Sequence, residues 1–187
     1  MMAPEEQARA NLYGLLARLF YGAPDARLLK AIADETLDGD LAQPWEDLKK
    51  AAVAADPATV QEEYETAFIG TGKAPVTLYT TAYATRANEV PLAELRGELS
   101  RLGLARRAEV REPEDHIAAL CDVMRHLVAK QQDDLEEQRR FFHRWIGPVA
   151  EKLCAAIDRS PATDFYKRVA AVAKRFFALE QTAFEML

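Results

Sequence analysis

Hydrophobic residues recur with a helical period along nearly the whole chain. Between Leu12 and Phe20 they fall at positions i, i+3, i+4, i+7 and i+8, which places them on one face of a helix. Similar stripes follow, separated by glycine and proline, and none shows the strict alternation of a half-buried strand. The pattern predicts an all-α fold, an irregular bundle of about eight helices.

Glycine and proline indicate where the helices of the first half begin and end. Asp56 before Pro57 predicts a capped helix start, and this helix is expected to run through Phe68 to Gly70. Two glycines and a proline within 70–80 then predict an ordered loop. A short helix or turn is expected directly after this loop.

Two proline positions shape the predicted helices of the C-terminal half. The Gly147-Pro148 pair lies inside a long apolar stripe, and it predicts a kink or break because Pro148 has no N–H for the helical ladder. Ser160 followed by Pro161 predicts a capped start of the last helix.

With 187 residues, the chain is long enough to bury the core of one helical domain covering 1–187. The basic segment 103–113 separates two helical regions, so we expect it to be a hinge between possible lobes 1–103 and 112–187. Such a segment would permit exchange of C-terminal helices between protomers. A monomer is the simpler expectation.

Charge and cysteine content narrow the functional classes. The formal net charge is −6, from 24 basic and 30 acidic side chains, which is poorly suited to binding nucleic acid. Cys121 and Cys154 lie in apolar helical patterns and form no CxxC pair. Charged residues interrupt the N-terminal apolar stretch, so we expect no export signal and no membrane span. These observations together predict a reduced, cytoplasmic protein.

The three histidines, His116, His126 and His143, form none of the common catalytic or metal-binding spacings. HExxH is absent, and so is the Glu-x-x-His pair of di-iron bundles. No convergent set of ligands predicts a metal site. No sequence context marks a nucleophilic serine or cysteine either, so the chain is not expected to be an enzyme.

The segment Gly70–Lys73 resembles the end of a phosphate-binding loop. Ala67 and Ala74 stand where a full Walker A motif needs glycine and serine or threonine, and a predicted helix precedes the segment instead of a strand. A turn that ends a helix explains the glycines. The backbone at Gly72 and the side chain of Lys73 could still contact a phosphate or carboxylate.

The run EPEDH at 112–116 is the most unusual local feature. Pro113 fits the first position of a helix with Glu112 at its cap, and Glu114 and Asp115 would then lie near the free N–H groups of the first turn. A good helix start does not explain His116 beside Asp115. The pair could hold a basic or backbone-rich ligand, or it could form a structural hydrogen bond to another helix end.

Three blocks, which follow one another along the chain in the family's order, make the chain similar to the TorD/DmsD/NarJ family of redox-enzyme maturation chaperones. The run EPEDHIAALCDVMRHL resembles the family signature. YETAFIGTGKAPVTLYTTAY at 64–83 resembles its aromatic and Phe-x-Gly segment, and the stretch at 141–180 is similar to its closing helices. Leu78 and Thr81 depart from the usual proline and serine, which leaves the client enzyme open.

The resemblance implies a cytoplasmic all-α chaperone that binds the twin-arginine signal peptide, or the apo-form, of a molybdenum-containing oxidoreductase. Such a protein delays export until the molybdopterin cofactor is inserted. The residues that match the family motifs would form an apolar trough with carboxylates at one end, although core packing competes as an explanation of each aromatic. They are Tyr64, Phe68, Gly70, Tyr79, Tyr83, Glu112, Pro113, Asp115 and His116.

The leading hypothesis is therefore a non-enzymatic molybdoenzyme chaperone, with a formate dehydrogenase as the expected client. The alternative is an accessory protein that holds a guanine nucleotide or molybdopterin at Gly70–Lys73. A helical scaffold without a ligand is the third reading of the sequence.

Overall fold

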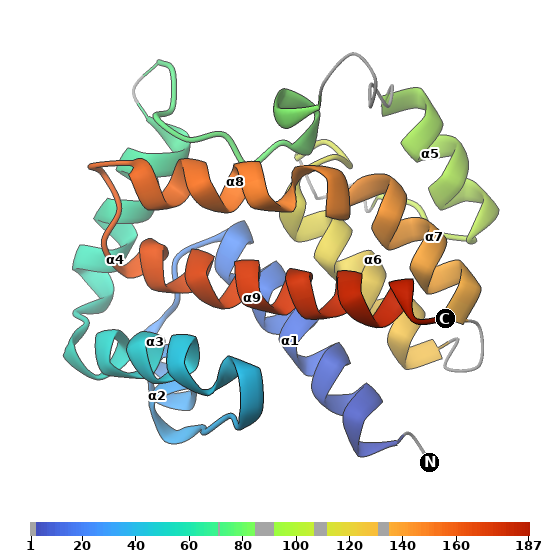
Figure 1. Cartoon of the computed structure of the whole chain (residues 1–187). Coiled ribbons are helices and arrows are strands. Elements are labelled where there is room, and N and C mark those ends of the chain that lie inside the picture. The colour runs from blue at the N-terminus through green and yellow to red at the C-terminus, as the bar shows by residue number, and fades with distance from the viewer. Residues whose placement is uncertain (1–2, 71, 85–91, 107–111, 131–134) are drawn as a thin grey trace. The chain divides into compact units, whose positions relative to one another are not determined.

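The computed structural model describes residues 3–70, 72–84, 92–106, 112–130 and 135–187. All regular structure in these ranges is helical, and the one β-type pairing there is a single bridge between Tyr79 and His116 (Figure 1). The predicted all-α fold is confirmed. The described α-helices are α1 Pro4–Tyr21, α2 Ala26–Asp34, α3 Ala42–Ala54, α4 Pro57–Tyr64, α5 Leu92–Arg101, α6 Ile117–Lys130, α7 Leu135–Trp145, α8 Gly147–Arg159 and α9 Phe165–Glu185.

Three shorter helical segments complete the described structure. The 3₁₀ turn η1 spans Gly39–Leu41, the π-helical turn η2 spans Glu65–Ile69, and the 3₁₀ turn η3 spans Thr80–Tyr83. The break predicted at Gly147-Pro148 is confirmed, because α7 ends at Trp145 and α8 begins at Gly147. None of the helices in the described ranges is long and apolar enough to cross a membrane.

The chain divides into two compact units. The first unit comprises Met1–Ala17 and Leu78–Val149, and the second comprises Arg18–Thr77 and Ala150–Leu187. This division does not coincide with the expected lobes, because the segment 103–113 falls within the first unit. Residues 107–111 of that segment lie outside the described residues, so its role as a hinge stays a prediction.

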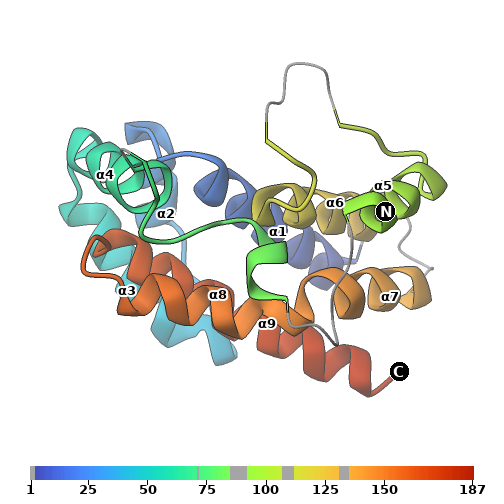
Figure 2. The same cartoon turned by 90° about the horizontal axis from the view of Figure 1, so that it is seen from above.

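The core of the second unit forms where α9 packs against α3 and α4, with α2 against α3. Phe165, Val169 and Phe176 provide part of the buried face of α9, and Trp45 and Leu48 provide part of that of α3. Helices α8 and α9 run antiparallel and are joined by a short turn (Figures 1 and 2). The helical periodicity of the sequence thus corresponds to real buried faces.

Helix α9 begins at Phe165, so the start predicted at Ser160 and Pro161 is wrong. Ser160 instead closes a turn in which its Oγ accepts a hydrogen bond from the Ala162 N–H at 3.2 Å. The Thr163 hydroxyl in the same turn donates to the carbonyl of Ile157 at 2.6 Å. The Ser160 hydroxyl, which would cap a helix that starts at Pro161, is used within this turn instead.

A carboxylate from α4 caps α9 instead. The side chain of Glu63 accepts hydrogen bonds from the N–H groups of Asp164, Phe165 and Tyr166, at 2.9, 3.0 and 2.8 Å. The first N–H groups of a helix have no partner within the helix, and a negative charge there also interacts favourably with the helix dipole. Glu63 therefore satisfies three such groups with one side chain.

Helix α4 begins as predicted, because the Asp56 side chain accepts a hydrogen bond from the Thr59 N–H at 3.0 Å. The chain then widens into η2, which ends with the Gly70 N–H donating to the carbonyl of Glu65 at 2.7 Å. Gly70 has a φ of +61°, and a Cβ there would lie 3.0 Å from the Cα of Ala74. Only glycine fits this turn without strain.

In the first unit, α6 and α7 pack against each other. One face of α6 is fully buried, including Ile117, Leu120 and Met124. Gly14 on α1 lies against α6, because a Cβ added there would be 2.8 Å from the Cδ of Arg125. This unit holds the acidic run at 112–116.

Candidate functional site

The acidic run forms a turn that precedes α6. The helix begins at Ile117, so the prediction that Pro113 occupies the first helical position is wrong. The Thr80 N–H donates to the carbonyl of Asp115, and the Ile117 N–H donates to the carbonyl of Leu78, both at 2.9 Å. These bonds hold residues 115–117 against the segment 78–80. The backbone groups of Asp115 and Ile117 that take part in them are not used in helical hydrogen bonds, and α6 begins at Ile117.

His116 is the cap of α6. Its Nδ1 accepts a hydrogen bond from the Ala118 N–H at 3.2 Å, and its carbonyl accepts from the N–H of Ala119 at 2.9 Å. The side chain is buried, and burial lowers the pKa of His116 despite the opposing charges of Glu112 and Asp115. The imidazole is therefore neutral near pH 7, and because Nδ1 accepts, its proton lies on Nε2.

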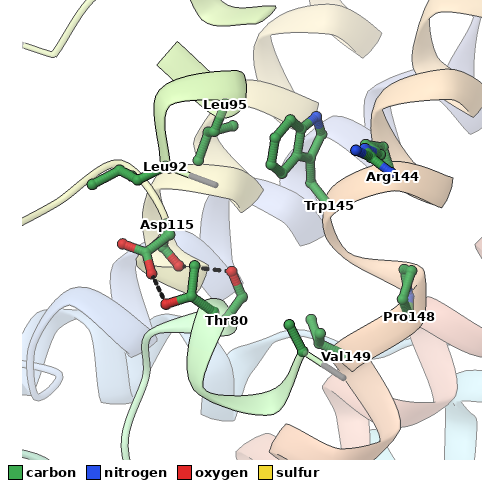
Figure 3. Close-up of a pocket in the computed structure, with 10 residues that line it drawn as sticks. Thr80, Leu92, Leu95, Asp115, Arg144, Trp145, Pro148 and Val149 are labelled. Carbon is green, nitrogen blue, oxygen red and sulfur yellow. Dashed lines mark hydrogen bonds between the residues drawn. The ribbon is translucent and has the colours of Figure 1, made fainter. Parts of the chain in front are cut away.

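Asp115 is a buried carboxylate, 6% exposed, that is held from the η3 segment. The Thr81 hydroxyl donates to its Oδ2 at 2.6 Å, and the Thr80 hydroxyl donates to its backbone carbonyl at 3.0 Å (Figure 3). Among the described residues, its Oδ1 accepts no hydrogen bond. This second carboxylate oxygen can accept a hydrogen bond from a further donor, and a cationic donor gives the stronger bond.

Tyr79 links η3 to the beginning of the acidic run. Its hydroxyl donates to the Glu112 carboxylate, and its ring meets the His116 ring edge-on at a centroid distance of 5.3 Å. The hydrogen bond to Glu112, burial, and the charges of Glu112 and Asp115 raise the pKa of Tyr79 to about 12. Tyr79 is therefore a neutral donor at physiological pH, and the charge here is carried by the carboxylates.

Glu114 was explained from the sequence only as part of a helical turn, yet it is the most strongly paired acid of the run. Arg96 donates to its Oε2 through Nε and Nη2, at 3.2 and 3.1 Å, and Arg106 lies 3.5 Å from Oε1. Burial opposes its charge, but the hydrogen bonds from Arg96 and its own backbone, and the charges of both arginines, lower the pKa of Glu114 overall. Glu114 therefore stays ionised down to acidic pH.

A small pocket of about 20 Å³ adjoins Asp115, which is space for about one water molecule. Thr80 and Asp115 form one side of the pocket, and Trp145 forms part of another (Figure 3). Thr81 also lines the pocket. The indole Nε1 of Trp145 is buried and has no hydrogen-bond partner among the described residues. In the sequence, Trp145 lies in the apolar stripe that contains Gly147-Pro148, and no local signal distinguishes it from a core residue.

The predicted aromatic residues are divided between the two units. Tyr64 and Phe68 belong to the second unit, where their rings pack with Tyr166 at centroid distances of 5.6 and 4.9 Å. Tyr64 is buried and its hydroxyl donates to the carbonyl of Phe20, so core packing explains it. Phe68 is half-buried.

The remaining predicted residues also follow this division. Gly70, Gly72 and Lys73 belong to the second unit, and Gly72 and Lys73 are exposed. Residue 71 lies outside the described residues. In the described ranges, no group of three or more histidine, cysteine, aspartate or glutamate side chains could hold a metal ion. A phosphate or cofactor contact at Gly70–Lys73 stays a prediction.

In the first unit, the structure brings the acidic run together with three residues of the aromatic block. Tyr79 and Thr81 bind Glu112 and Asp115 directly, and His116 supports the turn. Tyr83 ends the same 3₁₀ turn and is half-buried. The result is a cluster of carboxylates, neutral hydroxyls and a neutral imidazole, which can bind a cation but lacks an activated nucleophile.

Two comparisons with known proteins bear on the family of this chain. The family described as nitrate reductase delta subunit matches residues 34–155. The chain is also similar to the chaperone protein TorD of Photobacterium profundum, with 30% identity over 76 residues. This match covers 39% of the chain and 35% of that protein, so it spans about a third of the relative's length. Because the family match covers more than half of the chain and confirms the resemblance seen in the sequence, this protein belongs to the nitrate reductase delta subunit family.

Proposed function

We propose that this protein is a maturation chaperone for a molybdopterin-containing oxidoreductase. It holds the twin-arginine signal peptide or the apo-form of the client in the cytoplasm until the cofactor is inserted, and it catalyses no reaction itself. Family membership and the similarity to a protein named as a chaperone support this function. The observation that carries it is the buried Asp115 carboxylate, which uses only Oδ2 in its hydrogen bond from Thr81.

An arginine of the signal peptide suits this carboxylate. A guanidinium presents several donors in a rigid plane and can bind a carboxylate through two parallel hydrogen bonds. Glu112, which accepts from Tyr79, adds a second negative charge beside Asp115. Neither Tyr79 nor His116 carries a charge at neutral pH, so no cation competes with the peptide from these two positions.

His116 acts in this proposal as a positioning residue. Its Nδ1 is occupied by the Ala118 N–H, and its burial leaves little surface for a peptide. It fixes the start of α6 and thereby the place of the preceding Asp115. A flexible signal peptide loses conformational entropy on binding, so a moderate affinity is expected.

Calorimetric titration of the full chain tests the proposed function. A peptide with the twin-arginine motif should release heat and saturate, and its twin-lysine variant should bind more weakly because lysine cannot form the bidentate pair. Asp115→Asn should weaken binding by roughly tenfold or more, since the charge that meets the guanidinium is removed. The matched control is Asp122→Asn, because Asp122 is an exposed acid on α6 that pairs with Arg125 of its own helix.

Two results would contradict the proposal. If Asp115→Asn binds the peptide as tightly as the natural sequence but melts at a lower temperature, the acidic run is structural. If the peptide gives no binding while GTP or molybdopterin binds, the accessory-protein alternative at Gly70–Lys73 takes its place. The client is expected to be a formate dehydrogenase, and pull-down with its apo-form, compared with other molybdoenzymes, tests that choice.

A further inference from the structure

Helix α5 forms ion pairs with the rest of the first unit through both its arginines and its glutamates. Two of its arginines reach carboxylates elsewhere: Arg96 binds Glu114 at 3.1 Å, and Arg101 binds Glu137 at 2.6 Å. Two glutamates of α5 reach arginines of α7 in return. Glu94 pairs with Arg144 at 2.7 Å, and Glu98 lies 3.5 Å from Arg140.

The two carboxylates that receive these arginines are largely covered. The side chains of Glu114 and Glu137 are 11% and 9% exposed, whereas those of Arg96 and Arg101 are 55% and 47% exposed. Each pair therefore joins a largely buried carboxylate to a largely exposed guanidinium. Each acid also has a second cation outside α5: Glu137 is paired with Arg140 of its own helix, and Glu114 lies 3.5 Å from Arg106.

Leucines accompany the arginines. Leu95 and Leu99 are the buried residues of α5, and Leu92 with Leu95 closes the pocket beside Asp115 (Figure 3). With α5 in place, the pocket has room for about one water molecule and for no peptide side chain. A signal peptide that reaches Asp115 from this side must displace these leucines.

We propose that α5 is an internal stand-in for the signal peptide, that is, a helix of the protein itself that occupies the peptide's binding surface until the peptide displaces it. In the free protein its arginines and leucines occupy the surface formed by Glu114, Asp115 and the pocket. A bound signal peptide displaces the helix, placing an arginine on Glu114 and apolar side chains where Leu92 and Leu95 lie. This inference rests on the proposed function and adds to it an autoinhibitory contact that the client must overcome.

The composition of α5 permits such a displacement. The helix has ten residues and buries only two leucines, and a helix this short is marginal without tertiary contacts. Regions with few buried apolar contacts open at lower free energy than the core. The ion pairs can be exchanged for equivalent pairs with the peptide, because arginine and leucine are also what a twin-arginine leader provides.

Substituting either partner of the Arg96–Glu114 ion pair and measuring peptide affinity tests whether α5 occupies the peptide's place or is only a structural helix. Arg96→Ala leaves Glu114 with Arg106 as its remaining cation and loosens α5, so the twin-arginine peptide should bind about two- to fivefold more tightly. Glu114→Gln breaks the same pair but also removes the negative charge that would bind the peptide arginine, so the peptide should bind more weakly. Arg139→Ala is the charge control, because it removes an arginine that pairs only with Glu136 of its own helix among the described residues.

The outcomes of these titrations are distinct. Tighter binding by Arg96→Ala than by Arg139→Ala, with weaker binding by Glu114→Gln, supports the stand-in. If the natural protein binds the peptide but Arg96→Ala gives no gain beyond that control, the stand-in is wrong and the proposed function stands. If neither the natural protein nor Arg96→Ala binds, the proposed function fails and the stand-in fails with it.

Hydrogen–deuterium exchange of the natural protein tests the displacement without any substitution. Saturation with the twin-arginine peptide should speed exchange at the amides of Leu92–Arg101, while those of Ile117–Lys130 stay as slow or become slower. Unchanged or slower exchange in α5 on peptide binding overturns the proposal even if Arg96→Ala folds poorly.

Discussion

Each unit places carboxylates beside the beginning of a long helix, but the two arrangements differ in what the carboxylates bind. In the second unit, the Glu63 side chain accepts three backbone N–H groups of α9. In the first unit, Glu112, Glu114 and Asp115 precede α6, yet their side chains bind those of tyrosine, arginine and threonine. The capping of α6 is left to an imidazole.

This difference separates a structural carboxylate from one that is suited to a ligand. Backbone N–H groups of a helix end have no other partner, so replacing Glu63 would leave them unsatisfied. Side-chain partners can rotate away and hydrogen-bond to water or to another group. Under the proposed function, the acidic turn before α6 exchanges such side-chain partners for the peptide, whereas Glu63 keeps its backbone partners.

The largest expected effect comes from removing the backbone-bound carboxylate. Glu63→Ala should lower the free energy of unfolding by about 2 kcal/mol, because three N–H groups of α9 lose a charged acceptor. Urea denaturation followed by circular dichroism measures this. Glu62→Ala, on an exposed neighbour, should change stability by less than about 0.5 kcal/mol. Equal losses in the two variants would contradict the capping role of Glu63.

A smaller loss is expected at the cap of α6. His116→Ala should cost about 1 kcal/mol, the usual effect of removing an N-cap acceptor, while His116→Asn should recover most of it because asparagine caps well. The same denaturation experiment measures both variants. If His116 is a positioning residue, His116→Asn also keeps peptide affinity in the calorimeter. Loss of affinity with restored stability would show that the imidazole itself contacts the peptide.

Thr81→Val should cost about 0.5 to 1 kcal/mol of stability, because Asp115 loses its hydroxyl donor without a change in side-chain shape. Thr59→Val in the second unit is the matched comparison. There Asp56 keeps the Thr59 backbone N–H when the hydroxyl bond is removed, so a smaller loss is expected. Thermal melting of the two variants ranks them, and a larger loss at Thr59 would reverse the comparison.

The smallest expected effect is a dependence of stability on pH in the first unit. Burial lowers the pKa of His116 in the folded state, so below about pH 6.5 the unfolded chain binds a proton that the folded chain does not. The free energy of unfolding should therefore fall as the pH drops below that value. Glu114, whose pKa is also lowered, should add a further loss only below about pH 4.5.

Urea titrations between pH 7 and 5 measure the first of these losses. His116→Asn has no titrating group at this position, so its stability should change less over the same range. An identical slope for the natural protein and this variant would assign the pH dependence to other groups. Glu63→Ala should keep the slope of the natural protein, since it leaves His116 in place.

Local sequence signals predicted the structure well where the hydrogen-bond partners are close in the chain. Asp56 and Pro57 identified the start of α4 because the side chain of Asp56 binds an N–H three residues later. Ser160 and Pro161 offered the same signal for α9 and misled, because the acceptor for that helix is Glu63, 101 to 103 residues distant in the sequence. No local pattern contains such a partner.

The candidate site shows the same limit. The unusual run at 112–116 was recognisable in the sequence, and so was its association with the segment 64–83. Its geometry was not, because backbone hydrogen bonds from the segment 78–80 delay the start of α6 and turn His116 into its cap. The role of Glu114 was missed because its partner Arg96 belongs to another helix.

The sequence by itself determined the all-α class, the break at Gly147-Pro148, the family and the residues of the acidic run, since helical periodicity and motif identity are properties of neighbouring residues. Only the tertiary structure decided which carboxylate caps a helix and which carboxylates bind side chains instead. That choice depends on partners from distant segments, and in a helical protein these are brought together by the packing of side-chain surfaces, which the local pattern does not specify.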